Sequence, residues 1–480
     1  MAAADSGRAR AVAGSPQQHP PGYVGKLPLS LKAGWGVGSM GCLGMLYIVN
    51  VFVLYFLVNH LGVDPALAGL ILFITRIYDV FSDPMIGFLS DTTRSRWGRR
   101  RPWMALGAFM SGLALILTFN VPALASMNAL AIYQLIVLIA YFTGYTLFYV
   151  PFMAMPAEMT DDYNERTSIM AWRVGYSNFA GILIGAGMPA LINYLGADRR
   201  AYGIVAILVG ILIAATMTTT VLLTARAREL PSSQQDRYSI TDYFRALANN
   251  RPFLTLAALK ATLYLGVGVN GSALLFYMTY FLERGEGGLA LSTLAGNFAG
   301  LCTVPLWAYF ARGKDKRWVY MVAIVGSAIT LISWAFATPT EGDVVFVLRS
   351  CFVGIFGAGG LTIGFSMLPD TIEYDRIRTG KVRTALYTGV LGFVEKTGFA
   401  LGPLLMGFYF SAAGLVETTL GAVEQPDSAI TAIVNGKAWI PATLQALALF
   451  WLVSYRLTEK QLADMRGAAG ASGAPAPARE

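Results

Sequence analysis

Residues 76–103, RIYDVFSDPMIGFLSDTTRSRWGRRRPW, run from the interior of a long apolar segment into a block of arginines. Two aspartates, Asp79 and Asp83, lie four positions apart in the apolar part. Positions four apart share one face of a helix, so the two carboxylates are directed into the same space. A charged side chain at membrane depth costs about 2.5–3.5 kcal/mol on insertion scales. The pair therefore predicts a cavity, a partner or a bound cation.

The rest of the chain places this stretch in a membrane protein. Of the 480 residues, 55% are hydrophobic and 13% are charged, whereas a soluble domain carries about 25% charged residues. Apolar runs of about 20 residues recur from Leu31 to Leu457, and each is long enough to cross a bilayer. These runs do not alternate apolar and polar residues as the strands of a membrane barrel do. The sequence predicts an all-α polytopic membrane protein.

Twelve membrane spans are expected, in two sets of six. They cover residues 33–58, 66–92, 103–124, 129–157, 168–196, 200–224, 253–282, 288–311, 318–337, 344–369, 385–413 and 430–457. This division is typical of a transporter made of two repeats. The expected organisation is a disordered tail (1–28), an amino-terminal six-helix bundle (29–224), a central loop (225–252), a carboxy-terminal six-helix bundle (253–458) and a second disordered tail (459–480). Within the central loop, SITDYFRAL is compatible with a short amphipathic helix.

The distribution of basic residues predicts the orientation. Most of the 36 Lys and Arg residues fall in the tails or in the loops on the same side as the tails. The opposite side holds only Arg199, Arg200, Arg284 and Lys437. By the positive-inside rule, both termini are expected in the cytoplasm and the protein in the cell membrane. Because the charge is spread over membrane-flanking loops, a patch for binding nucleic acid is not expected.

Enzymatic chemistry is not expected from the sequence. It contains no P-loop, no metal-ligand spacing and no convincing pair of nucleophile and base. Transport driven by ATP hydrolysis in this chain alone is therefore not expected, and the free energy should come from an ion gradient or from the gradient of the substrate.

Two interpretations of the aspartate pair follow from the residues alone. In the first, Asp79 and Asp83 bind a hard cation such as Na⁺, which prefers oxygen ligands, or they carry a proton. Pro84 supports this, because it removes a backbone donor and can free another carbonyl oxygen. In the second, Asp79 pairs with Arg76 on the same helix face. The second explains only one of the two aspartates, so the cation site is favoured.

The run from Asp79 to Trp103 resembles the glycoside–pentoside–hexuronide:cation symporter family of the major facilitator superfamily. The matching positions are Asp79, Asp83, Pro84, Gly87, Asp91, Thr93, Ser95, Arg96, Gly98 and the arginines before Pro102. Further matches are TLFYVPF (146–152), DDYNERT (161–167), PDTIEY (369–374) and FVEKTG (393–398). The resemblance covers about residues 30–457. It implies the major facilitator fold, with twelve helices in two six-helix bundles, and a monomer.

The resemblance also implies roles. Asp79 and Asp83 would coordinate the coupling Na⁺, Li⁺ or H⁺, Thr146 would add an oxygen, and Lys396 would lie beside the cation from the opposite half. Lys396 is about a dozen residues into its span, near the middle of the membrane, where its ammonium can compensate the carboxylates. The alternative is a pair between Lys396 and Glu395, but adjacent helix positions do not face each other.

Two positions depart from the pattern of sugar-binding members. Galactoside-binding relatives carry acids in the first and fourth spans, where this chain has Leu43 and Tyr149. Neither side chain accepts several hydrogen bonds as a carboxylate does. The expected substrate contacts are Ser39, Tyr47, Asn50, Tyr145, Tyr149 and Trp172, and Trp35 is a further aromatic candidate for stacking on a sugar face or aglycone. For any single aromatic residue, packing or an interface position is the competing interpretation.

A network of charges is expected near the cytoplasmic ends of the spans. Asp91 ends a helix, where an acid is unfavourable to the helix dipole, so it should serve another contact. Arg173, about one turn into the fifth span, is expected to pair with Asp91 or Glu158, with an anionic substrate as the alternative partner. The whole expected network is Arg76, Asp91, Arg99, Arg100, Glu158, Arg173, Asp370 and Glu373.

Three functions fit these observations. A cation-coupled symporter of a glycoside or related sugar conjugate, working by alternating access, is favoured by the family resemblance. A cation-coupled carrier of an amphiphile such as a lysolipid is favoured by the missing sugar-binding acids. The third function is that of a non-transporting membrane sensor or scaffold that retains the fold. It is disfavoured, because such a protein would not need costly buried charges. The expected partners are a small-molecule substrate and the lipid bilayer, with the coupling cation in place of a cofactor.

Overall fold

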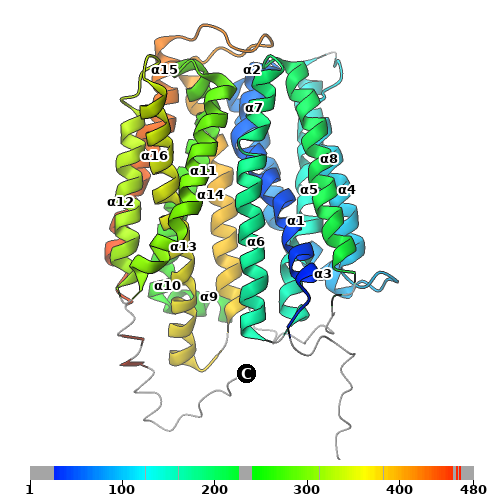
Figure 1. Ribbon diagram of the computed structural model, residues 1–480, viewed down its shortest axis with the longest axis vertical. Helices are drawn as coiled ribbons and strands as arrows, with labels where there is room; N and C mark the ends of the chain where they lie inside the picture. Colours follow the sequence, from blue (N-terminus) through cyan, green and yellow to red (C-terminus); the bar gives the residue numbers. More distant parts are fainter. Residues whose placement is uncertain are drawn as a thin grey trace, which may run out of the picture.

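The computed structural model describes residues 26–124, 126–160, 162–225, 227, 240–312, 314–381, 383–457, 461–462 and 464–465. In this part of the chain, twelve helical segments are long and apolar enough to cross a membrane (Figure 1). The prediction of twelve spans is confirmed. The expected disorder of the two tails concerns residues that lie almost entirely outside the described ones.

The amino-terminal half supplies six of these spans. Its elements are α1 (Leu29–Ile48), η1 (Val49–Val53), α2 (Leu54–Asn59), α3 (Pro65–Thr92), α4 (Arg101–Phe119), α5 (Met127–Met159), α6 (Tyr163–Leu183), α7 (Gly187–Tyr194) and α8 (Arg199–Leu223). The segments α1, η1 and α2 form one continuous span with a π-helical turn at η1. The fifth span is made of α6 and α7.

The carboxy-terminal half supplies the other six. Its elements are α10 (Arg251–Phe276), η2 (Tyr277–Phe281), α11 (Gly285–Ala311), α12 (Lys316–Trp334), α13 (Asp343–Thr379), α14 (Thr384–Ala412), α15 (Asp427–Val434), η3 (Asn435–Trp439) and α16 (Ile440–Ser454). Before them, α9 (Ile240–Asn249) lies in the central loop, as the SITDYFRAL pattern indicated.

Local sequence signals set the helix ends. The Asp64 side chain accepts a hydrogen bond from the Leu67 amide at 3.0 Å, and Pro65 occupies the first turn of α3. Asn250 caps α10 in the same way, also followed by a proline in the first turn. Caps of this kind satisfy backbone donors that the helix leaves unpaired.

The tenth span was expected to end at residue 369, but α13 continues to Thr379 and is capped by Gly380, which has φ 68°. The helix passes through Pro369 without ending. The apolar pattern stops at 369 because the following residues are polar. Hydropathy therefore located the membrane-embedded part of α13 and missed the polar turns that extend beyond it.

The bundle has two ends, the terminal face and the far face. The terminal face is the end where α1 begins and α16 ends, at the bottom of Figure 1, and the far face is the end where α2 ends. On the far side, backbone amides of Thr418 and Gly421 donate to the carbonyls of Val58 and Asn59, each at 3.0 Å. These bonds join the loop after α14 to the end of α2, so the two halves are in contact at the far face.

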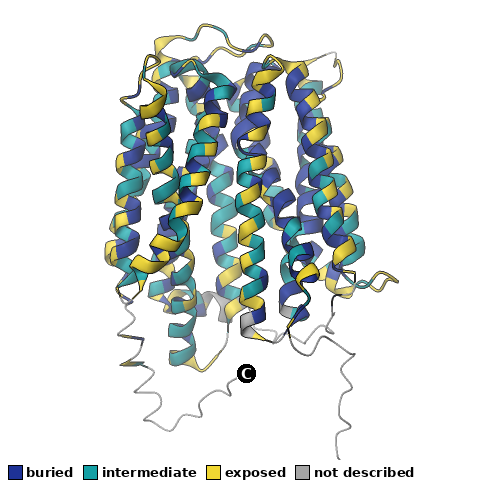
Figure 2. Ribbon diagram, viewed as in Figure 1, coloured by how far each residue is buried: buried dark blue, intermediate teal, exposed yellow. Residues whose placement is uncertain are grey.

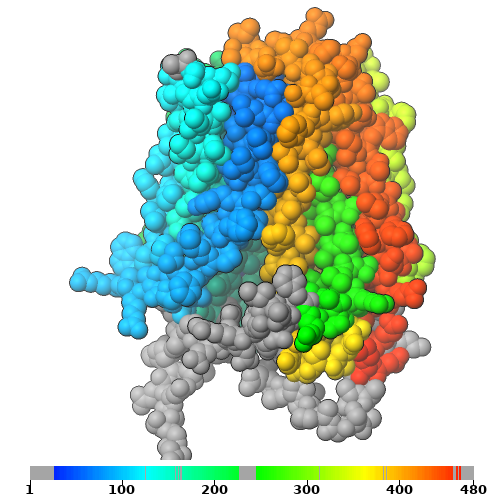
Figure 3. Space-filling model, turned by 180° about the vertical axis from the view of Figure 1, so that it is seen from behind, coloured from blue at the N-terminus to red at the C-terminus, as the bar shows by residue number. Residues whose placement is uncertain are grey.

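The seam between α3 and α14 is also tightest toward the far face. The two helices lie side by side in Figure 3, which views the molecule from behind. A Cβ added at Gly69 would lie 2.6 Å from the carbonyl oxygen of Pro403. A Cβ added at Gly407 would collide with the carbonyl oxygen of Pro65. Glycine at both positions therefore lets the two backbones approach.

Several glycines in the helices have no close neighbour. A Cβ added at Gly175 of α6, Gly357 of α13, or Gly389 or Gly392 of α14 would meet no atom within 4 Å. The same holds for Gly187 of α7 and for Gly342 and Gly414 at the far face, so open space borders the backbone toward both ends of the molecule.

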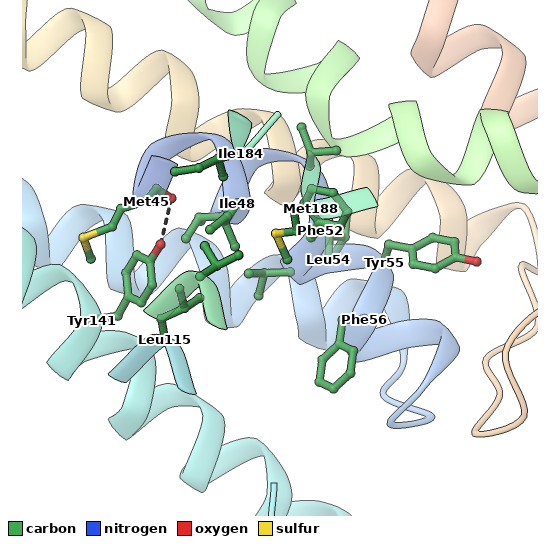
Figure 4. Packing of buried hydrophobic residues seen from close by; sticks show 14 of the residues in the cluster. Met45, Ile48, Phe52, Leu54, Tyr55, Phe56, Leu115, Tyr141, Ile184 and Met188 are labelled. Carbon is green, nitrogen blue, oxygen red and sulfur yellow. Dashed lines mark hydrogen bonds between the residues drawn. The ribbon is translucent and has the colours of Figure 1, made fainter. Parts of the chain in front are cut away.

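The first span lies at the centre of the amino-terminal half. In its most apolar 18-residue window 78% of residues are buried, against 17% for α13 (Figure 2). Figure 4 shows Met45, Ile48 and Phe52 packed against neighbouring helices, with the Tyr141 hydroxyl donating to the Met45 carbonyl at 2.8 Å. The first span thus lies in the core of the amino-terminal half, where α1 packs mainly against α6 and α8.

Candidate functional site

Four polar side chains from three helices meet in the interior of the molecule. The Lys396 ammonium of α14 lies 2.7 Å from Asp79 Oδ2 and 2.6 Å from Asp83 Oδ2, both on α3. The Thr146 hydroxyl of α5 donates to Asp79 Oδ1 at 2.6 Å and lies 3.2 Å from Asp83 Oδ1. We call these four residues the carboxylate cluster. It joins the two halves, because Lys396 comes from the carboxy-terminal half and the other three from the amino-terminal half.

The local structure of α3 explains how both carboxylates reach Lys396. Asp79 and Asp83 stand one helical turn apart on the same face. The helix continues through Pro84, which has no N–H to donate to the carbonyl four residues earlier. The Ser82 hydroxyl donates to the carbonyl of Asp79 at 3.0 Å. Asp79 is fully buried, whereas Asp83 retains partial exposure.

The cluster contains two carboxylates and one ammonium. With both acids ionised, its formal charge is −1, so one further positive charge or one proton would neutralise it. The four carboxylate oxygens and the Thr146 hydroxyl are hard ligands of the kind that alkali cations prefer. Among the described residues, no set of three or more His, Cys, Asp or Glu side chains has the geometry of a metal centre.

Arg76 does not pair with Asp79, although the sequence raised that alternative. Its guanidinium Nη2 donates to Asn50 Oδ1 at 2.9 Å, and its Cζ lies 4.6 Å from the centroid of the Phe142 ring. No Asp79 oxygen lies within 4.0 Å of an Arg76 nitrogen; that carboxylate contacts Lys396 instead. Asn50, an expected substrate contact, is thereby engaged by Arg76.

Two other expected substrate contacts also have protein partners. The Ser39 hydroxyl donates to the Gly36 carbonyl at 2.6 Å. The Tyr47 hydroxyl lies 3.2 Å from both the Gly185 carbonyl and the Thr293 hydroxyl. Ser39 is buried and Tyr47 is half-buried. The Tyr47–Thr293 contact is a further point where polar atoms of the two halves meet.

The expected aromatic contacts divide into two groups. Tyr145 and Tyr149 stack with ring centroids 5.0 Å apart, and Tyr149 keeps partial exposure while Tyr145 is buried. Trp172 is also half-buried, beside Tyr176. In contrast, Trp35 is fully buried against Phe152 and donates to its carbonyl at 3.0 Å, which is a packing role.

The structure groups four residues of the expected charge network at the terminal face. Arg99 Nη2 and Arg100 Nη2 lie 2.6 Å and 2.9 Å from Glu158 Oε1. Arg100 also lies 3.1 Å from Asp91 Oδ1, and Arg99 lies 4.0 Å from it. These residues, which we call the arginine cluster, all belong to the amino-terminal half and tie α3 and α5 to the start of α4.

Arg173 joins neither acid of the arginine cluster. No Asp91 or Glu158 oxygen lies within 4.0 Å of its guanidinium, because Arg99 and Arg100 occupy those carboxylates. The backbone carbonyl of Arg173 instead lies 3.1 Å from the Ser39 hydroxyl. The pairing of Arg173 considered from the sequence is therefore absent in this conformation.

The carboxy-terminal half carries its own ion pairs near the terminal face. Lys316 Nζ lies 2.8 Å from Asp370 Oδ2, and Arg376 Nη1 lies 3.6 Å from Glu373 Oε2. Both acids were expected from the sequence, whereas their basic partners were not. The sequence did contain a signal for Lys316, because this residue begins α12 after a short basic loop, just as Arg101 begins α4.

A buried contact at the far face was also missed. The Tyr202 hydroxyl of α8 donates to Glu286 Oε1 of α11 at 2.7 Å, and both residues are at most 5% exposed. The position of Glu286 in the first turn of α11 suits the helix dipole. Nothing in the sequence indicated that Tyr202 would be its partner in the other half.

Comparison with known proteins agrees with this architecture. The family described as MFS/sugar transport protein matches residues 34–459. The uncharacterized symporter YnaJ of Bacillus subtilis is 29% identical over 92% of this chain and 95% of the relative. The putative glycoside/cation symporter YagG of Escherichia coli is 25% identical over 91% of this chain and 94% of the relative. The isoprimeverose transporter of Lactiplantibacillus pentosus is 23% identical over 94% of both chains.

A solved structure shows the same fold. The crystal structure of the nucleoside transporter NupG aligns with a TM-score of 0.60 and 15% identity, covering 89% of this chain and 99% of that one. At this identity the likeness establishes only the arrangement of helices. Together with twelve spans and a family match over nearly the whole membrane region, it leaves one conclusion: the chain belongs to the MFS/sugar transport protein family, whose members move solutes across membranes.

Proposed function

We propose that this protein is a cation-coupled symporter of a glycoside or related sugar conjugate, working by alternating access. The observation that carries the proposal is the carboxylate cluster, in which Lys396 of one half contacts Asp79 and Asp83 of the other. Two relatives, a putative glycoside/cation symporter and an isoprimeverose transporter, support the substrate class.

In the proposed mechanism, the coupling cation competes with Lys396. Without a cation, the ammonium compensates the two carboxylates and holds α14 against α3. When Na⁺ or a proton neutralises Asp79 and Asp83, the attraction between Lys396 and these acids weakens. The cation thereby changes the force between the halves, which is the requirement for a rocking motion about a central site. Cation and substrate then raise each other's affinity, and linkage makes this effect reciprocal.

The orientation follows from the basic loops. The terminal face carries most of the arginines and lysines, so we assign it to the cytoplasm together with both termini. The contacts between Thr418 and Val58 and between Tyr202 and Glu286 then lie on the outer side. The close approach of α3 and α14 at Gly69 and Gly407 lies on the same side. These contacts support a conformation that is closed to the outside.

The candidate substrate residues support a partly apolar ligand. Tyr149 and Trp172 offer half-buried aromatic surface on which a sugar ring could stack. Ser39, Tyr47 and Asn50 already bond within the protein, so we propose that they contact substrate only after these bonds rearrange. Leu43 stands where galactoside-binding relatives have an acid, and it is 36% exposed. This replacement favours a glycoside with an apolar aglycone and keeps a lysolipid as the alternative cargo.

The remaining charged residues are proposed to control the inner side. The arginine cluster would keep the terminal ends of α3, α4 and α5 together as one rigid part while the halves move. Asp370 would do the same for α12 and α13 through Lys316, while Glu373 pairs with Arg376 within α13. We assign Arg76 to positioning Asn50, and Arg173 to a contact that forms in another conformation.

The proposal is tested by the thermal stability of the purified protein in NaCl or choline chloride, with a panel of glycosides, hexuronides and lysolipids. A glycoside should raise the melting temperature more in Na⁺ than in choline. In Asp83→Asn the Na⁺ effect should vanish, while Glu424→Gln, which removes an exposed far-face carboxylate, should retain it. An unchanged Na⁺ response in Asp83→Asn would refute the assignment. Stabilisation by lysolipids alone would assign the alternative cargo, and a response to pH in place of Na⁺ would identify the proton as the coupling ion.

A further inference from the structure

We propose that the far face carries a separate binding site for a phosphate or a similar oxyanion. The site is a recess of about 760 Å³. Its walls are the loops that follow α2 and α4, the beginning of α8, and residues 419–420 of the loop after α14. The recess lies at the surface of the far face, whereas the carboxylate cluster lies in the interior of the bundle.

The recess carries an excess of positive charge. Arg199 and Arg200 line it at the start of α8, and neither has a carboxylate oxygen within 4.0 Å among the described residues. Arg199 Nη2 donates to the Val121 carbonyl at 2.8 Å, which fixes this guanidinium at the recess wall. Asp198 is the one acid in the lining, and its Oδ1 already accepts the Ala201 amide at 2.7 Å. The lining therefore contains two guanidinium groups, a helix amino terminus and one carboxylate, so its net charge is positive.

His60 provides an independent sign of a missing ligand. It lines the recess, is 1% exposed, and its Nε2 has no hydrogen-bond partner in the described part of the chain. Its ring packs against Tyr202 and Phe56, with centroids 4.6 Å and 5.6 Å away. A buried polar group without a partner costs about 1–3 kcal/mol. An oxyanion bound between the arginines would supply an acceptor for an imidazole N–H.

The ionisation of His60 fits donation to such a ligand. It lies between spans, and burial lowers its pKa to about 4, with Asp198 raising and Arg199 lowering it. The imidazole is thus neutral near pH 7 and carries one N–H. The fixed positive charge of the site comes from the arginines, and His60 adds a directional hydrogen bond.

The recess exists as such only while the halves are closed at the far face. Thr419 and Leu420 of the carboxy-terminal half complete a wall whose other members come from the amino-terminal half. They are held there by the backbone bonds of Thr418 and Gly421 to α2. A ligand that contacts both halves binds this conformation better than one with the far face open, and so it shifts the population toward it.

The experiment measures binding of inorganic phosphate to the purified full-length protein by calorimetry and by thermal stability, at constant ionic strength with chloride as the reference anion. Arg200→Gln removes an exposed charge, and His60→Phe removes the nitrogens while keeping an aromatic ring against Tyr202. Each variant should bind phosphate about tenfold more weakly, the scale of one charge-assisted or buried hydrogen bond. Arg94→Gln, which removes an exposed arginine at the terminal face, is the matched control and should bind as the parent does.

A second arm identifies the source of the oxyanion. The same proteins are placed in nanodiscs of phosphatidylglycerol or of phosphatidylcholine. Stabilisation by phosphatidylglycerol that Arg200→Gln and His60→Phe both diminish, without a response to free phosphate, assigns the site to a lipid headgroup. Equal binding by the parent and both variants, or no response in either arm, overturns the proposal.

Discussion

The carboxylate cluster and the arginine cluster are both made of acids and bases in close contact, but they differ in which parts of the protein they join. In the carboxylate cluster, Lys396 reaches Asp79 and Asp83 across the boundary between the halves. In the arginine cluster, Arg99 and Arg100 contact Glu158 within one half. The first therefore changes whenever the halves move relative to each other, whereas the second can remain intact.

This difference separates two uses of buried charge. A charge pair that crosses a moving boundary must be weak enough to break during each cycle, and a competing cation provides the means. An acid inside a rigid part has no such requirement and can contact more than one base, as Glu158 contacts two arginines. Substitutions should therefore affect cation response in one cluster and the stability of a bundle in the other.

Replacing Lys396 with methionine should have the largest effect. It leaves Asp79 and Asp83 together without a positive partner, and breaking a buried ion pair costs about 3–5 kcal/mol. We expect a large loss of stability in choline and a larger rescue by the coupling cation than in the parent, because the competing ammonium is gone. Denaturation midpoints in NaCl and choline chloride, supplemented by a pH series, measure this. The double variant with Asp83→Asn should regain stability in choline, and failure to do so would argue that Lys396 acts through other contacts.

Lowering the pH should reduce the stability of the folded protein through His60, which belongs to neither cluster. Burial lowers the pKa of His60 to about 4, while Asp198, Arg199 and the rings of Tyr55 and Tyr202 surround it. An unfolded histidine titrates near 6.5. The unfolded state therefore binds the proton first, and stability present above pH 6.5 is lost as the pH falls toward 4.

The size of this loss is at most about 3 kcal/mol, from 1.36 kcal/mol for each pKa unit. Comparing melting temperatures of the parent and His60→Phe between pH 7 and pH 4 isolates it. The parent should lose more stability than the variant over that interval. Parallel pH profiles would show that His60 is protonated as readily in the folded protein as in the unfolded one.

Glu158→Gln should destabilise the amino-terminal half by about 2 kcal/mol, since charge-assisted hydrogen bonds to buried arginines contribute about 1.5–3 kcal/mol. Because the arginine cluster does not cross the boundary, the stabilisation by Na⁺ or protons should stay as in the parent. Thermal unfolding with and without the cation gives both quantities. Loss of the cation response in this variant would contradict the division between the clusters.

Asp370→Asn should have the smallest effect. It breaks the pair with Lys316, but both side chains are about a third exposed, at 33% and 27%. Pairs of this exposure contribute less than about 1 kcal/mol and are screened by salt. The expected shift in unfolding midpoint is therefore small and should disappear in high salt. A shift as large as that of Glu158→Gln would mean that Asp370 holds more than this one lysine.

The sequence predicted the fold because hydropathy runs report directly on membrane spans. It also predicted that Asp79 and Asp83 share a face, since their spacing of four matches the helical turn. Lys396 could not be derived in this way: 313 residues separate it from Asp83, and its role came from the family resemblance. The spacing of two residues along the chain predicts their relative positions only when both lie in the same helix.

Contacts between distant elements were correspondingly hard to predict. The bond between Tyr202 and Glu286 spans 84 residues and depends on how α8 and α11 meet. The expected pairing of Arg173 named acids whose partners proved to be Arg99 and Arg100, which are nearer along the chain to Asp91. A charged residue in an apolar span indicates that a partner exists, but the identity of the partner depends on the tertiary fold.

The glycine seam between α3 and α14 has a consequence for how the protein could be manipulated. At Gly69 a single added methyl group would lie 2.6 Å from the Pro403 carbonyl oxygen in the present conformation, in which the halves are in contact at the far face. If the seam separates when the far face opens, Gly69→Ala penalises one conformation and leaves the other nearly untouched. A difference of about 1.4 kcal/mol between them changes their ratio tenfold. One carbon atom at this position would thus shift the resting equilibrium between the two conformations, and would let the form with an open far face be collected for study without any ligand.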